Sequence, residues 1–178
     1  MKVRLCYIVL TYIITGMYKT IAILGRQPAL GIAELESLFG ADAVEPYGTY
    51  ACFLKMKPQD VDFTRLGGSI RLCEIIEESP VNWRNIENKL LDTVPAYASE
   101  IEGKFSFGIS SFGLSINKKT IARSALTIKK TIKQSGSSVR MVPHNDLILG
   151  SATVLYNKLT AENGLEICVI SDGETAFI

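Results

Sequence analysis

The segment from Asn117 to Gly136 constrains the fold most, because it has the pattern of a helix with two opposite faces. At about 100° per residue, four apolar residues fall on one stripe: Ile121, Ala125, Ile128 and Ile132. Lys119, Arg123 and Lys130 fall on the opposite side. Asn117 is a suitable N-cap and Ser135-Gly136 a suitable stop. We therefore expect one face of this helix to pack on a core and the other to present cations to solvent.

The same region contains no acidic residue. Between Glu102 and Asp146 lie eight basic residues and no carboxylate: Lys104, Lys118, Lys119, Arg123, Lys129, Lys130, Lys133 and Arg140. The net charge of the whole chain is only +1, so the first part, up to residue 102, carries the excess of acid. An uncompensated row of cations suits a phosphate backbone. The alternative is an ordinary solvated helix face.

Composition favours a folded, reduced protein. Of the 178 residues, 47% are apolar and 21% charged, which is enough to bury a core. The four cysteines lie apart in apolar runs and His144 is the only histidine, so no zinc or other metal site is expected. Free thiols and the absence of a membrane-spanning run favour a cytoplasmic protein.

The order of apolar runs and turn signals predicts two α/β units after an N-terminal extension. Residues 1–17 imitate a signal peptide but lack a cleavage site, so they are an extension, a mis-assigned start or a targeting or membrane segment. Residues 18–80 predict the β-α-β-β-α-β order of a ferredoxin-like domain. Its expected elements are a strand at 18–24, a helix that has Pro28 in its first turn and continues over 30–39 until Gly40 ends it, strands at 43–47 and 50–56, a helix at 58–66 and a strand at 69–76.

Residues 81–178 predict a linker helix followed by a second α/β domain. The linker helix covers 81–98, is interrupted at Pro95, and uses Trp83 as a packing anchor rather than a base-stacking platform. The remaining expected elements are a strand at 104–113, the cationic helix, a strand at 138–142 that carries Arg140, a helix at 147–159 capped by Asp146, and strands at 165–170 and 174–178. The abrupt end on an apolar strand suggests that a longer protein continues beyond Ile178.

The sequence shows binding chemistry without reaction chemistry. No GxGxxG, GxxxxGK[ST] or GxSxG motif is present, and no histidine is paired with a carboxylate cluster. Catalytic residues and a cofactor site are therefore not expected in this chain. His144 follows Pro143 beside the cationic helix and is a candidate contact for an RNA phosphate or base.

Three segments resemble a known family. The cationic helix, LILGSATVLYNKL at 147–159 and LEICVISDGETAFI at 165–178 together resemble a THUMP domain. AILGRQPALGIAELESLFG at 22–40 resembles the start of the ferredoxin-like domain that precedes THUMP in tRNA guanine-N2 methyltransferases. The resemblance covers roughly residues 18–178.

The resemblance implies a tRNA-binding function. In that family THUMP grips the 3′ end and acceptor stem of tRNA, while a downstream domain transfers a methyl group from S-adenosylmethionine. The glycine-rich loop and the Asp/Asn-Pro-Pro-aromatic motif of that domain are absent here, so the methyltransferase domain would be downstream or on a separate chain. We expect the candidate RNA-binding residues to form a single surface: Lys118, Lys119, Arg123, Lys130, Lys133, Arg140, His144, Asn157 and Lys158.

Two alternatives remain open. A thiouridine synthetase also places a ferredoxin-like domain before THUMP, and a PP-loop downstream would identify it. A two-module α/β assembly protein without RNA would have merely solvated lysines.

Overall fold

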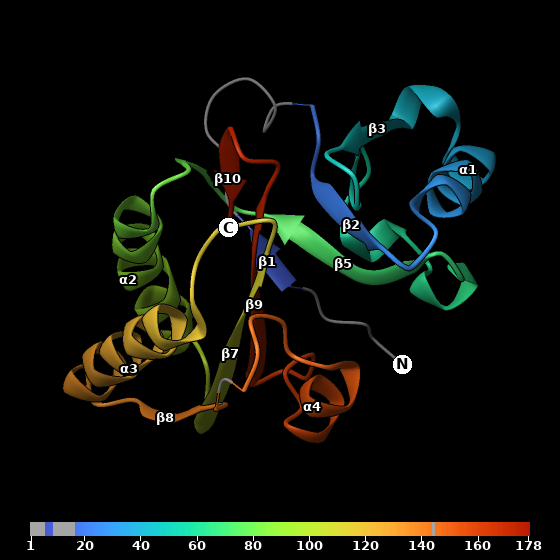
Figure 1. Ribbon diagram of the computed structural model, residues 1–178. Helices are drawn as coiled ribbons and strands as arrows, with labels where there is room; N and C mark the ends of the chain where they lie inside the picture. Colours follow the sequence, from blue (N-terminus) through green and yellow to red (C-terminus); the bar gives the residue numbers. More distant parts are fainter. Residues whose placement is uncertain (1–5, 9–16, 144) are drawn as a thin grey trace.

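The computed structural model describes residues 6–8, 17–143 and 145–178 of the chain, and it is a mixed α/β fold (Figure 1). The predicted fold class is confirmed at this level. Of the N-terminal extension, Met17 and strand β1 (Cys6–Ile8) are described. The predicted contact residue His144 lies outside the described residues.

The first unit is a four-stranded antiparallel sheet with one helix. Its elements are β2 (Thr20–Leu24), α1 (Pro28–Phe39), β3 (Val44–Tyr47), β4 (Ala51–Leu54) and β5 (Ser69–Ile75). The strands lie in the order β3-β4-β2-β5 and every neighbouring pair is antiparallel. Helix α1 begins at Pro28 and ends at Gly40, as its Pro and Gly signals predict. It covers one face of this sheet through a core that includes Leu35, Leu54 and Leu72.

The helix predicted at 58–66 is wrong. Two single 3-10 turns, Pro58–Asp60 and Phe63–Arg65, take its place. Asp62 explains the break, because its carboxylate accepts hydrogen bonds from the backbone N–H and the hydroxyl of Thr64. Such local side-chain bonds compete with helix propagation.

The second unit is a mixed sheet between helices, parallel except for its last strand. Its elements are α2 (Trp83–Ser99), β7 (Lys104–Phe112), α3 (Lys118–Gln134), β8 (Ser138–Met141), α4 (Ser151–Tyr156), β9 (Gly164–Ser171) and β10 (Thr175–Phe177). Strand β7 is central, with β8 and β9 parallel on its two sides. Helices α2 and α3 pack on one face of β7 and β9, and α4 lies on the other (Figure 1). Helix α2 continues through Pro95, contrary to the predicted interruption, and Val94 and Ala98 on either side of it are buried.

The helix predicted at 147–159 is much shorter than expected. Helix α4 begins after Gly150, and Asp146 does not cap it. The preceding backbone is bound to β7 instead: Ser111 N donates to the carbonyl of Leu147 (2.8 Å), and Leu149 N donates to the hydroxyl of Ser110 (3.1 Å). Those bonds take the place of the helical bonds in the first predicted turn, and residues 145–148 form bends instead.

The two units share a continuous sheet and a common core. Strand β1 lies between β5 and β9 and is parallel to both. Strand β6 (Glu78–Pro80) follows β5 along the chain but pairs antiparallel with β10. The face of the first sheet that α1 leaves free packs against the second unit, with Phe53 and Tyr47 against Phe177 at ring-centroid distances of 5.2 Å and 4.6 Å. The predicted boundary at 80/81 falls at the end of β6 and stays a prediction.

Candidate nucleic-acid interface

Helix α3 has the two faces that its sequence predicts. The side chain of Asn117 caps it by accepting a hydrogen bond from the N–H of Thr120 (3.0 Å). Ile121, Ala125, Ile128 and Ile132 are each 0% exposed and pack in the main core with β7, β8 and α2. Burial of this stripe fixes the rotation of the helix about its own axis. The opposite face must therefore point to solvent.

Four cations form a straight row on that exposed face, which we call the α3 ridge. Its members are Lys119, Arg123, Lys130 and Lys133, all exposed. They fall within an arc of about 80° and span about 21 Å along the axis at about 1.5 Å per residue. None of the four forms an ion pair with any residue that the structure describes. The glutamates of the first unit therefore do not neutralise the ridge.

Lys118 is not a member of the α3 ridge and makes a contact within the protein. Its Nζ donates a hydrogen bond to the backbone carbonyl of Asn145 at 2.9 Å. This bond ties the start of α3 to the loop that follows β8. We therefore assign Lys118 a structural contact in addition to its exposed charge.

Arg140 lies on the other side of the sheet from α3. In β8, Val139 points into the core under α3, while Val142 joins the core under α4. Because side chains alternate along a strand, the exposed Arg140 shares the α4 side with Val142. Arg140 is therefore not part of the α3 ridge, and the predicted single surface is divided between two faces.

Asn157 and Lys158 follow α4 and also differ from each other. The amide of Asn157 donates to the carbonyl of Thr153 (2.8 Å) in its own helix. Lys158 is exposed and adopts a left-handed backbone with φ of 54°. The carbonyl of Lys158 lies against Gly164 of β9. Gly164 is paired with Ser106 of β7, and Ser106 is paired in turn with Arg140 of β8. Arg140 is therefore two strand spacings, or about 10 Å, from the strand against which Lys158 lies.

A buried polar network joins the two units, and the sequence patterns did not reveal it. Arg71 Nε lies 2.7 Å from Glu166 Oε2, with the side chains 11% and 0% exposed. The other carboxylate oxygen accepts from Ser110 Oγ at 2.7 Å. Arg71 also donates to the carbonyl of Leu149 (3.0 Å) and to Ser151 Oγ (3.2 Å). One feature of the sequence does indicate this network: Glu166 lies within the apolar run LEICVI, and a buried glutamate needs a polar partner.

Burial dominates the titration of this carboxylate. Desolvation, with a smaller contribution from Cys168, raises the pKa of Glu166 to about 7, and the opposing effects of Arg71 and Ser110 do not offset it. The carboxylate has both oxygens occupied, and it supports the fold rather than facing an open site.

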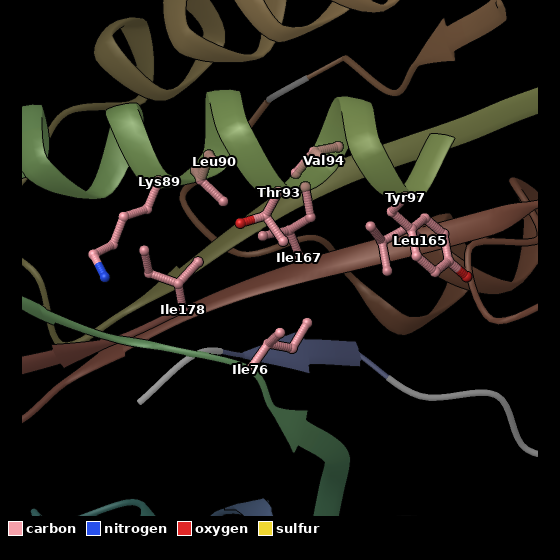
Figure 2. Close-up of a pocket in the computed structure, with 9 residues that line it drawn as sticks. All are labelled: Ile76, Lys89, Leu90, Thr93, Val94, Tyr97, Leu165, Ile167 and Ile178. Carbon is pink, nitrogen blue, oxygen red and sulfur yellow. The ribbon is translucent and has the colours of Figure 1, made fainter. Parts of the chain in front are cut away.

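The hollows of the surface differ in kind. Figure 2 shows an apolar hollow between α2, β9 and the end of the chain, where Leu90, Val94 and Ile167 converge and Lys89 lies at the rim. Lys89 forms an ion pair with Glu77. The apolar hollow holds only about 30 Å³, about the volume of one water molecule and far below that of ordinary ligand pockets. Larger open hollows flank α3: about 350 Å³ beside Leu126, Lys130 and Lys133, and about 690 Å³ at its N-terminal end.

Among the described residues, no cluster of three or more His, Cys, Asp or Glu side chains is arranged to hold a metal ion. None of the helices in residues 17–143 and 145–178 has the length and apolar character needed to cross a membrane.

Comparison with known proteins gave no match: no family model, no curated protein and no solved structure is similar to this chain.

Proposed function

We propose that this chain is a tRNA-binding module whose α3 ridge contacts the phosphate backbone. The observation that carries the proposal is the ridge itself: four exposed cations on a rigidly packed helix, with no described acidic partner. Cations of this kind release counterions from nucleic acid when they bind phosphates. A fixed row on one helix suits a regular backbone better than a compact small anion.

The order of elements supports the family that this proposal implies. The order β3-β4-β2-β5, antiparallel throughout and with α1 after β2, agrees with a ferredoxin-like domain in which 3-10 turns replace the second helix. The alternation of strands and helices from α2 to β10 agrees with the THUMP-type order expected from the sequence. We further propose that a separate methyltransferase domain, which would bind S-adenosylmethionine, acts on the RNA held here. A cytoplasmic location belongs to the same proposal and is supported by the buried free thiol of Cys52.

Salt dependence tests the proposal. Binding of a tRNA transcript, measured by fluorescence anisotropy between low and moderate salt, should weaken steeply as salt rises. Arg123→Ala and Lys130→Ala should each reduce the slope of log K against log salt by about 1. Lys57→Ala, which removes an exposed cation from the first unit, is the matched control and should leave the slope unchanged. Absent or salt-independent binding would contradict the proposal.

A further inference from the structure

An open hollow lies at the N-terminal end of α3, next to the start of the α3 ridge. Its volume is about 690 Å³, within the range of small-molecule sites. Trp83, Leu114, Ile116 and Leu147 supply apolar surface, and Thr120 supplies part of the wall from α3. No acidic residue is among the described side chains that line it. We call this the Trp83 hollow.

The indole of Trp83 is held in one orientation. Its Nε1 donates a hydrogen bond to Ser124 Oγ on α3 at 2.9 Å, and that hydroxyl bonds in turn to the carbonyl of Thr120 (3.2 Å). The ring is half-buried between α2 and α3, so Trp83 is the packing anchor that the sequence predicts. The same ring also lines the hollow. A ring fixed in this way offers an aromatic surface at little cost in side-chain entropy.

The hollow and the ridge are continuous along one helix. Arg123 follows Thr120 by three residues, so the two side chains are neighbours on the helix surface, and Lys119 lies one turn before Arg123 on the ridge. A polyanion that follows the ridge toward the N-terminus of α3 would therefore arrive at the hollow. Neighbouring cations and the lack of an acidic lining residue favour an anionic occupant over an apolar protein segment.

We infer that the Trp83 hollow receives an unpaired nucleotide, with its base against the indole and its phosphate near Lys119 and Arg123. This inference rests on the proposed function and extends it from phosphate contact to base contact. RNA-binding proteins commonly stack unpaired bases on aromatic side chains, and apolar walls of this kind match the faces of a base. Such stacking tolerates any base, so the hollow selects unpaired structure rather than sequence.

Trp83 is the only tryptophan of the chain, so its emission reports on this hollow alone. The experiment compares two RNA hairpins with identical stems, one blunt and one with an unpaired four-nucleotide tail. The tailed hairpin should bind about tenfold more tightly, within the range for stacking one base. It alone should quench Trp83 emission and protect the indole from acrylamide.

A blocking variant tests the hollow without disturbing the core. Ser115 is exposed at its rim, and Ser115→Phe should abolish the tail's tenfold advantage while leaving binding of the blunt hairpin unchanged. Ser37→Phe, the same change at an exposed serine of α1, should have neither effect. Thermal melting of both variants checks that they fold.

The outcomes separate the two proposals. If both hairpins bind but the tail neither quenches Trp83 nor depends on Ser115, the inference is wrong and the proposed function stands. If neither hairpin binds, both are wrong. Quenching that rises with protein concentration in the absence of RNA would show that a second copy fills the hollow, and would also overturn the inference.

Discussion

Arg71 on β5 and Glu166 on β9 form a 2.7 Å ion pair that joins the two units of the fold. The glutamate is fully buried, and the arginine also binds the carbonyl of Leu149 just before α4. One guanidinium therefore holds together the first sheet, the second sheet and the segment that leads into α4.

Removing the arginine should cost much of the stability of the protein. Arg71→Ala leaves the Glu166 carboxylate buried without its cation, and a broken buried pair typically lowers the free energy of unfolding by about 3–5 kcal/mol. Urea unfolding followed by circular dichroism measures this loss. Arg84→Ala removes an exposed arginine of α2 and should change the same quantity by no more than about 0.5 kcal/mol. A loss below about 1 kcal/mol for Arg71→Ala would show that the pair is not a significant link.

Glu166 should also give stability a pH dependence of defined sign. Its folded pKa of about 7 lies above its ordinary value of 4.5, so the folded state binds more protons than the unfolded state between these values. The free energy of unfolding should therefore be greatest at the acidic end of this window and fall as pH rises toward 7, by about 3 kcal/mol. In Glu166→Gln this fall should be absent, whereas in Glu174→Gln, an exposed control, it should persist. Parallel pH profiles for the wild type and Glu166→Gln would contradict the assignment.

The two faces of α3 should respond differently to truncation. Ile128→Ala creates a cavity at a fully buried position and should lower the free energy of unfolding by about 2–5 kcal/mol. Leu126→Ala, two residues earlier and 55% exposed, should change it by less than about 0.5 kcal/mol. Chemical denaturation of the two variants in parallel provides the measurement, and equal losses would mean that the helix is rotated from the orientation described.

Two glycines with the same left-handed backbone should differ in their tolerance of a methyl group. At Gly113 (φ 73°), a Cβ would lie 1.9 Å from both the carbonyl oxygen of Ser171 and the hydroxyl of Tyr50. At Gly136 (φ 89°), nothing lies within 4 Å of it. Gly136→Ala should cost only the left-handed strain, about 1–2 kcal/mol. Gly113→Ala adds overpacking of about 1–3 kcal/mol, and the difference should show directly in the two melting temperatures. Equal melting temperatures would contradict the close approach of Tyr50.

The separation of cations onto two faces predicts additivity in RNA binding. Arg123 lies on the α3 ridge and Arg140 on the α4 side, so the two share no contact. The losses in binding free energy from Arg123→Ala and Arg140→Ala should add in the double variant to within about 0.5 kcal/mol. Arg123→Ala with Lys119→Ala, within one ridge, is the comparison pair and should deviate from additivity. Strong coupling between Arg123 and Arg140 would restore the single surface that the sequence suggested.

The sequence predicted best what a single element determines. The apolar stripe from Ile121 to Ile132 fixes both the extent and the rotation of α3, and Pro28 and Gly40 mark the ends of α1. The sequence-based prediction failed where contacts with residues far away in the chain determine the conformation. The segment before α4 is not helical because Ser110 and Ser111 of β7 bind its backbone, which no local pattern reveals.

The candidate site followed the same rule. Helical spacing correctly grouped Lys119, Arg123 and Lys130, because they share one helix face, and the structure adds Lys133 to that face. It could not assign Arg140 to the opposite side of the sheet, since that depends on which face of β8 the helix covers. Arg71 resembled an ordinary surface arginine for the same reason: its partner, Glu166, lies 95 residues further along the chain.

Strand β6 has a practical consequence for anyone who wishes to study the second unit alone. Because it pairs with β10, a fragment that starts at residue 81 would expose the backbone donors and acceptors of Thr175–Phe177 along an unprotected edge. Exposed edges of this kind recruit strands from other molecules, so such a fragment should aggregate, and a recombinant version is better begun upstream of Glu78.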